Sequence, residues 1–302
     1  MRKVLWDFSQ NLRRMMQKIN KAVIPVAGYG TRFLPFTKAV PKAMLPIVNR
    51  PAVQVVVEEA VAAGIEEIYL VIGQHKDIIE AHFSPSIDLE EHLEKCGDVK
   101  RLEEVRRLSD MAKITYIVQE KQTGTASAVL CAEKYIGNEP FAVMFGDDVM
   151  LSEKPVIGQL SEVYAKTGKT TIGVKNVGFD NVFKYASVEF DKQDGRIYNA
   201  TAITEKPDPG TAKSDLAPLG RYIFNSDIFE ILHNLKPGKN NEYQLTDAFR
   251  YEIERRGVNA YAFEGARYDM GDVYGYLQAN MDFALRDKNL ADKLKAHIDE
   301  IR

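Results

Sequence analysis

Four short, mostly apolar runs, separated by stretches with helical spacing, constrain the fold of this chain more than any other feature. The runs lie at residues 22–26, 68–72, 114–118 and 141–145. Strands that are apolar at nearly every position are buried on both faces, which is typical of a parallel sheet covered by helices. Helices are expected between the runs, at 52–63, within the charged stretch 74–110 and at 125–136. The sequence therefore predicts an α/β fold with a mixed, mostly parallel sheet flanked by helices.

The pattern changes after about residue 175. Segments 185–190 and 197–204 flank Asp194-Gly195, a dipeptide typical of a tight turn, and predict an inserted antiparallel hairpin. A strand at 221–224, helices near 226–235 and 244–256 and a strand near 258–264 are expected to follow. Neither an internal repeat nor a Ser/Gly-rich linker interrupts the chain, so one mixed domain over residues 21–287 is the simplest interpretation.

The two ends differ from this domain. The first twenty residues carry five basic side chains and one acidic one, without the apolar core of a secretory signal. We expect an N-terminal arm over residues 1–20, with an amphipathic helix that touches a partner or a membrane surface as the alternative. Residues 288–302 predict a C-terminal helix that docks through Leu290, Leu294 and Ile298. No run approaches the roughly 20 apolar residues of a membrane span, so a cytoplasmic protein without membrane contact is expected.

The charge balance limits the classes of ligand. With 40 Lys and Arg against 43 Asp and Glu, the formal net charge is −3, which argues against general nucleic-acid binding. The two cysteines cannot build a disulfide framework. A near-neutral chain can still bind a strongly anionic ligand if its positive charge is concentrated in one cleft.

The loop after the first strand offers such a place. Gly28 and Gly30 let the backbone approach a phosphate group closely, at the sheet edge where ligands of α/β proteins bind. Phe33 stands where a dinucleotide-binding fingerprint needs its third glycine, which argues against an NAD-dependent dehydrogenase. Val163 stands where a P-loop ending in Gly168-Lys169-Thr170 needs its first glycine. Both standard nucleotide motifs therefore fail.

Three cations follow on the same loop. Arg32, Lys38 and Lys42 are interleaved with prolines at positions 35, 41 and 46, which restrict the backbone. Cations on a stiff loop beside exposed amides suit a triphosphate and its leaving pyrophosphate. Solvated surface charges are the alternative interpretation.

The stretch from Ala22 to Pro51 resembles the signature of sugar-1-phosphate nucleotidyltransferases, and most closely that of the bacterial UTP–glucose-1-phosphate uridylyltransferases. The resemblance implies a GT-A-like, Rossmann-related fold, Mg²⁺ dependence, UTP and glucose 1-phosphate as substrates, and a homodimer or homotetramer. It divides the domain into a nucleotide-binding half, about 21–150, and a sugar-binding half, about 151–287. Tyr29 and Ala43 depart from the usual Leu and Glu, and neither change removes a cation.

Further motifs match the same family over roughly residues 20–287 and imply individual roles. The resemblance assigns the nucleotide to Ala27, Gly28, Gly30, Gln119, Gly124 and Asp147. It makes Asp147 the metal ligand, with Asp148 as a supporting partner of Asp147. Asp269 is the second metal-site residue, with contact to the sugar as the alternative role of Asp269. It assigns the sugar to Glu205, Lys206 and Gly220, and catalysis to Arg32, Lys42 and Lys206. The segment 242–248 matches a helix-opening motif, in which Thr246 and Asp247 are expected to cap the helix.

The reaction implied is an in-line attack of the glucose 1-phosphate oxygen on the α-phosphorus of UTP. No side-chain nucleophile is needed, because the attacking phosphate is already largely dianionic at neutral pH. Two alternatives stay open: a sister enzyme that uses dTTP or another sugar 1-phosphate, and a non-catalytic sensor of nucleotide sugars. A sensor is expected to have lost a catalytic cation or the metal-binding aspartate, and this chain retains them all.

Overall fold

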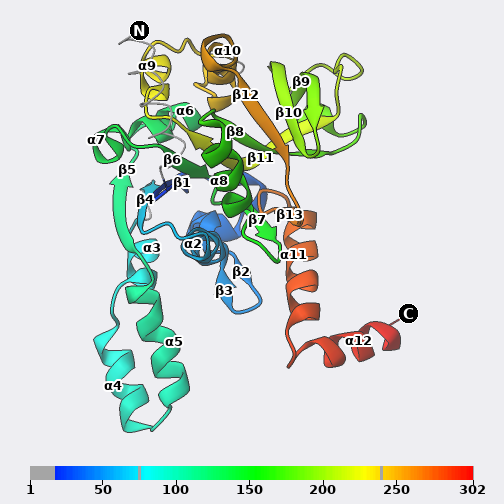
Figure 1. The fold of residues 1–302 in the computed structure, drawn as a ribbon. Helices are drawn as coiled ribbons and strands as arrows, with labels where there is room; N and C mark the ends of the chain where they lie inside the picture. The colour runs from blue at the N-terminus through cyan, green and yellow to red at the C-terminus, as the bar shows by residue number, and fades with distance from the viewer. Residues whose placement is uncertain (1–17, 74–75, 239–240, 302) are drawn as a thin grey trace.

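The computed structural model describes residues 18–73, 76–238 and 241–301. In this part of the chain, one nine-stranded sheet has the order β5-β4-β1-β6-β11-β8-β12-β10-β9, with helices on both of its faces (Figure 1). Only β11 and β10 run against the other strands, so the prediction of a mixed, mostly parallel sheet is confirmed. Of the predicted arm, positions 1–17 lie outside the described residues.

The first half of the chain supplies four neighbouring parallel strands, as predicted. They are β1 (Lys21–Pro25), β4 (Glu67–Ile72), β5 (Lys113–Val118) and β6 (Phe141–Met144). Helix α2 (Ala52–Ala62) begins directly after Pro51, a residue suited to a helix start. The charged stretch forms α3 (Lys76–Phe83), α4 (Ile87–Lys95) and α5 (Val99–Asp110), of which α4 and α5 extend away from the sheet (Figure 1).

The single helix predicted at 125–136 is wrong. The structure has two short helices, α6 (Thr125–Leu130) and α7 (Glu133–Ile136). The regular pattern breaks because the amide of Ala132 bonds to the Val129 carbonyl three residues earlier instead of four.

The second half adds the predicted hairpin at one edge of the sheet. Its strands β9 (Ala186–Asp194) and β10 (Ile197–Glu205) are longer than expected, and β10 pairs with β12 (Val258–Ala262). The remaining elements of this half are α8 (Val156–Thr167), β8 (Thr171–Asn176), η4 (Val182–Lys184), β11 (Leu216–Phe224), α9 (Ile228–His233) and α10 (Leu245–Arg256).

Several very short elements escape the sequence patterns. The proline-rich loop contains three 3₁₀ turns and a small hairpin: η1 (Thr31–Phe33), η2 (Phe36–Lys38), η3 (Lys42–Met44), β2 (Pro46–Ile47) and β3 (Arg50–Pro51). A separate antiparallel pair joins β7 (Asp148–Leu151) to β13 (Ala266–Asp269). Segments of two to four residues are too short to show a hydrophobic period.

The C-terminal region forms two helices, α11 (Val273–Arg286) and α12 (Ala291–Glu300). Tyr276 of α11 packs edge-on against Phe33, with the ring centroids 5.8 Å apart. The predicted C-terminal helix therefore exists, but no residue of α12 is buried, and Leu290, Leu294 and Ile298 are only half-buried. The expected docking was overstated, because α12 extends away from the sheet (Figure 1).

Across the described ranges, every helix is too short or too polar to span a bilayer.

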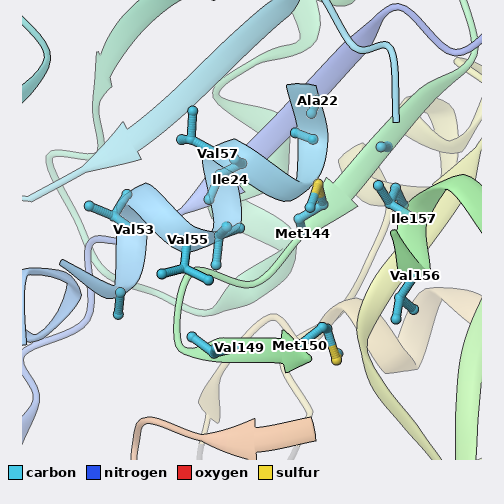
Figure 2. Packing of buried hydrophobic residues seen from close by; sticks show 14 of the residues in the cluster. Ala22, Ile24, Val53, Val55, Val57, Met144, Val149, Met150, Val156 and Ile157 are labelled. Atoms are coloured by element: carbon cyan, nitrogen blue, oxygen red, sulfur yellow. The ribbon is translucent and has the colours of Figure 1, made fainter. Parts of the chain in front are cut away.

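The core lies on both faces of the sheet, because alternate residues of a buried strand point to opposite sides. In β1, Ala22 and Ile24 belong to one apolar cluster and Val23 to another. Figure 2 shows the first cluster, where β1 packs against Val53 and Val57 of α2. This two-sided burial holds the carboxyl ends of β1 and β6 in place, and the cavity described next opens there.

Candidate active site

A cavity of about 530 Å³ lies at the carboxyl ends of β1, β5 and β6. It brings together all six residues predicted to bind the nucleotide and one of the predicted catalytic cations: Ala27, Gly28, Gly30, Gln119, Gly124, Asp147 and Lys42. These residues come from three loops that follow three parallel strands, the usual ligand position in such sheets.

The glycine loop is shaped by contact with Lys42. Gly30 has a left-handed backbone (φ 64°), and its carbonyl accepts a hydrogen bond from Thr37 Oγ1 at 2.8 Å. A methyl group on Gly30 would lie 2.9 Å from Cβ of Lys42. The glycine therefore allows the Lys42 stem to pack directly against the loop.

Gln119 and Gly124 form another part of the cavity wall. The buried Gln119 amide donates to Ser127 Oγ at 2.8 Å and, at 3.5 Å, to the Gly124 carbonyl. These bonds orient the amide, and its carbonyl oxygen accepts no bond from the described residues. Gly124 has φ 125°, and a side chain there would collide with the backbone of Tyr243. The wall thus presents one oriented acceptor beside exposed backbone.

Several polar residues without a predicted role also line the cavity, among them Gln122, Glu242 and Gln244. Gln244 accepts a hydrogen bond from Thr125 Oγ1 at 3.2 Å and donates to Glu242 at 2.5 Å. Gln244 contacts Thr125, which lies 119 positions away in the sequence, and a local sequence pattern does not predict contacts over such a separation. Only their membership of the 242–248 motif could have drawn attention to Glu242 and Gln244.

Asp147 follows β6 and pairs with Lys42. The Lys42 ammonium lies 2.5 Å from Asp147 Oδ2, and only 16% of the lysine side chain is exposed. Burial opposes ionisation of Asp147, but the charge and hydrogen bond of Lys42 outweigh it and hold the pKa of that carboxyl below its ordinary value. The carboxylate is therefore charged at neutral pH.

The β7–β13 pair brings a second aspartate to the same place. Asp269 pairs in register with Asp148, and the amide of Met270 donates to the Asp147 carbonyl at 2.8 Å. Arg267 bonds to Asp148 Oδ1 at 2.5 Å and lies 3.4 Å from Asp269 Oδ2. Burial raises the pKa of Asp148 to about 6, although Arg267 opposes this shift.

Arg32 lies at the rim, outside the cavity lining. Its side chain is exposed and donates to the Gly271 carbonyl at 3.3 Å. A methyl group on Gly271 would be 3.5 Å from both Arg32 Nη1 and Lys42 Nζ, and 2.8 Å from Asp269 Oδ1. Arg32, Lys42 and Asp269 therefore converge on one glycine. Lys38 is exposed and does not line the cavity.

Glu205, Lys206 and Gly220 also lie outside the cavity lining. Strand β10 ends at Glu205, and Lys206 has a left-handed backbone (φ 43°). This turn brings Lys206 Nζ to 3.4 Å from Glu205 Oε1, although successive strand residues normally point to opposite faces. The Lys206 amide donates to the Tyr185 carbonyl at 2.9 Å, and Arg267 lies over the Tyr185 ring at 5.3 Å. Arg267 thereby connects the aspartates to the Glu205-Lys206 pair.

Gly220 is required by Asp148. The backbone of Gly220 is left-handed (φ 57°), and a side chain there would collide with the Asp148 carboxylate. The Asp148 side chain fills the space beside this glycine. The role of Gly220 in sugar binding therefore stays a prediction.

A fully buried arginine holds the aspartate loop and was not predicted. Arg221 binds Glu59 of α2 through two nitrogens, with the shortest distance 2.6 Å. It also donates to three backbone carbonyls, at 3.3 Å, 2.9 Å and 2.8 Å, those of Phe145, Gly220 and Asp148. These hydrogen bonds fix the loop that carries Asp147.

This fold, with its glycine loop and its lysine–aspartate pair, defines the chain as a nucleotidyl transferase. The profile of the nucleotidyl transferase family matches residues 21–285. A UTP–glucose-1-phosphate uridylyltransferase of Bacillus subtilis is 47% identical over 279 residues, covering 92% of this chain and 96% of the relative.

Solved structures agree. A UTP-bound UGPase from Acinetobacter baumannii has a TM-score of 0.87 and 34% identity, covering 94% of this chain and 100% of the other. A UDP-glucose pyrophosphorylase complexed with UDP-glucose has a TM-score of 0.81 and 39% identity, over 89% of this chain and 100% of the other. The chain belongs to the UTP–glucose-1-phosphate uridylyltransferases within the nucleotidyl transferase family, which confirms the resemblance found in the sequence.

Proposed function

We propose that the protein transfers UMP from UTP to glucose 1-phosphate, giving UDP-glucose and pyrophosphate. The observation that carries this proposal is the cavity, which combines an oriented amide acceptor at Gln119 with the paired Lys42 and Asp147. An amide oxygen suits the N3–H of uracil, and the ammonium suits a triphosphate. The nucleotide-binding half is then about 21–150, with Glu242 and Gln244 contributed by the sugar-binding half, about 151–287.

In this mechanism the side chains align and neutralise two anions and make no covalent intermediate. Lys42 and Arg32 hold the triphosphate of UTP, and Lys206 holds the phosphate of glucose 1-phosphate while Glu205 accepts hydrogen bonds from sugar hydroxyls. The sugar phosphate oxygen attacks the α-phosphorus in line, and pyrophosphate leaves from the opposite side. Such positioning contributes on the order of 7–11 kcal/mol to catalysis.

We also propose that Mg²⁺ binds at Asp147 and Asp269. Mg²⁺ prefers one or two carboxylates together with phosphate oxygens and water, and these aspartates stand on adjacent chain segments beside the cavity. With two carboxylates from the protein, such an ion would complete its shell with substrate phosphates and water. When bound, the ion would neutralise charge on the phosphates.

The test is pyrophosphate release with each of four NTPs and with dTTP, each combined with several sugar 1-phosphates. UTP with glucose 1-phosphate is expected to be the best pair. A preference for dTTP or another sugar would identify a sister enzyme, and the absence of release with every pair would leave a non-catalytic sensor. Uracil and thymine differ by one methyl group, worth about 1–3 kcal/mol, so the dTTP reaction needs kinetic comparison and not a single endpoint.

We further propose that the protein is a cytoplasmic homodimer or homotetramer. In support of self-association, α11 exposes four large apolar side chains: Val273, Tyr274, Leu277 and Met281. Exposed apolar clusters often mark protein interfaces. Light scattering of the purified protein measures the assembly directly, and a monomer at all concentrations would refute it.

A further inference from the structure

Thr246, the second residue of α10, connects this helix to the end of β10. The sequence predicted that Thr246 and Asp247 cap the helix, and this is wrong. The N-cap is Gln244, whose side chain makes no capping hydrogen bond, and the Leu245 amide at the start of the helix donates to Thr125 Oγ1 at 2.9 Å. The Thr246 hydroxyl instead donates to Glu205 Oε2 at 2.8 Å, across 41 positions of sequence.

The two oxygens of Glu205 have different partners. Oε2 accepts from Thr246, whereas Oε1 lies 3.4 Å from Lys206 Nζ. The Glu205 side chain is only 15% exposed, but that of Lys206 is 42% exposed. When Lys206 turns to a phosphate, Glu205 loses one of these contacts and keeps the other.

The residue after Thr246 on α10 is a second carboxylate, Asp247. Burial and then the negative charge of Glu205 raise the pKa of Asp247. Repulsion between two carboxylates favours movement toward solvent, and the hydrogen bond from Thr246 to Glu205 opposes such movement.

We propose that Thr246 is a positioning residue that orients Glu205 for the hydroxyl groups of the sugar 1-phosphate. The inference rests on the proposed function, in which Glu205 binds the sugar. Thr246 holds Oε2, so Oε1 becomes the free acceptor when Lys206 moves to the phosphate. The residue thus acts on sugar affinity and not on the nucleotide.

The test compares Thr246→Val, which keeps the shape but removes the donor, with Thr246→Ser, which keeps the donor. For Thr246→Val we expect KM for glucose 1-phosphate to rise about ten-fold, as for loss of a hydrogen bond to a charged group. KM for UTP should stay within about two-fold, and Thr246→Ser should restore near-normal values. Thr201→Val, an exposed threonine on β10, is the matched control.

A mutant cycle with Glu205→Gln separates positioning from a general structural role. If Thr246 acts through Glu205, the double variant should raise KM for glucose 1-phosphate no further than Glu205→Gln alone. Independent, multiplying effects or an unchanged KM in Thr246→Val would overturn the inference. UTP binding and the melting temperature report folding, and Thr246→Ala runs the same cycle if the valine variant is unfolded. Failure of the wild-type protein to use glucose 1-phosphate would instead refute the proposed function.

Discussion

At the scale of single residues, the site depends on backbone shapes that few side chains adopt. Lys206 is left-handed, a conformation that costs roughly 1–3 kcal/mol for a residue with a side chain. The turn made by this strained conformation places the Lys206 ammonium beside Glu205. A strained lysine at the end of a strand supports a role in binding, because a purely structural turn would be better served by glycine.

We predict that Lys206→Ala lowers kcat by roughly 100-fold or more, because one charge that aligns the attacking phosphate is lost. Affinity for UTP should be retained, as measured by calorimetry. Lys213→Ala is the matched control, since Lys213 is an exposed lysine that pairs with Glu189 of β9 at 3.1 Å. An equal loss of UTP affinity would move Lys206 to the nucleotide site.

Glu252 is a buried acid that the proposed mechanism does not use. Thr170 donates to its Oε2 at 2.7 Å, while Oε1 has no partner in the described part of the chain. Burial raises the pKa of this carboxyl above its ordinary value of 4.5. The folded state therefore binds the proton more tightly than the unfolded state, and stability falls as pH rises from about 4.5 through the raised pKa.

Glu252→Gln is thus predicted to flatten the pH dependence of stability above about pH 4.5 and to leave the protein at least as stable at neutral pH. Urea unfolding at several pH values measures this, with activity as a check on the native fold. A larger loss of stability at neutral pH in the variant would show that the charged form of Glu252 is favourable.

At the scale of elements, regular strands were predictable and their long-range partners were not. The runs of apolar residues identified β1, β4, β5 and β6 because each strand is apolar at nearly every position. The Arg221–Glu59 pair joins residues 162 positions apart, and β7 and β13 have four residues each. Such contacts depend on how the elements pack, so a local pattern does not contain them.

The same limit applies to the candidate site. Family motifs identified Gln119, Gly124 and Lys42, which the structure brings to one cavity. The motif that contains Thr246 was also recognised, but the capping role predicted for Thr246 was wrong because the partner of its hydroxyl, Glu205, lies on strand β10. The identity of the residues predicted which side chains line the cavity. The packing of the elements decides which of their atoms form hydrogen bonds with each other.

The buried pair gives an element-scale prediction. Glu59→Ala would leave the Arg221 charge unpaired in the core, and we expect a loss of about 3–5 kcal/mol in the free energy of unfolding. Glu91→Ala, which removes an exposed pair with Lys95 on α4, should cost less than about 1 kcal/mol. Urea titrations compare the two, and equal effects would mean that Arg221 is not held mainly by Glu59.

At the scale of the whole molecule, the net charge of −3 is an average over unlike regions. Arg32 and Lys42 converge near Gly271, while Lys206 is linked to the same region through Tyr185 and Arg267. The composition excluded a broad basic surface, and the structure places two cations together, Lys42 in the cavity lining and Arg32 at the rim.

This local charge predicts a dependence on salt. Raising KCl from about 0.05 to 0.5 M shortens the screening length severalfold, so KM for UTP and for glucose 1-phosphate should both rise. The turnover number kcat should change less, because the bound anions are shielded from the solution. Steady-state kinetics at constant pH measure this, and KM values that are indifferent to salt would argue against electrostatic capture.

Because Lys42 and Asp147 neutralise each other, a ligand that binds one of them must displace the other. The ammonium already has a counter-ion at 2.5 Å, so a phosphate that takes the lysine must leave the aspartate in need of another cation. Anion uptake and cation uptake are thereby coupled by charge balance alone. Singly charged anions of the medium gain little by displacing the carboxylate, whereas a polyphosphate that arrives with its own cation satisfies both partners at once.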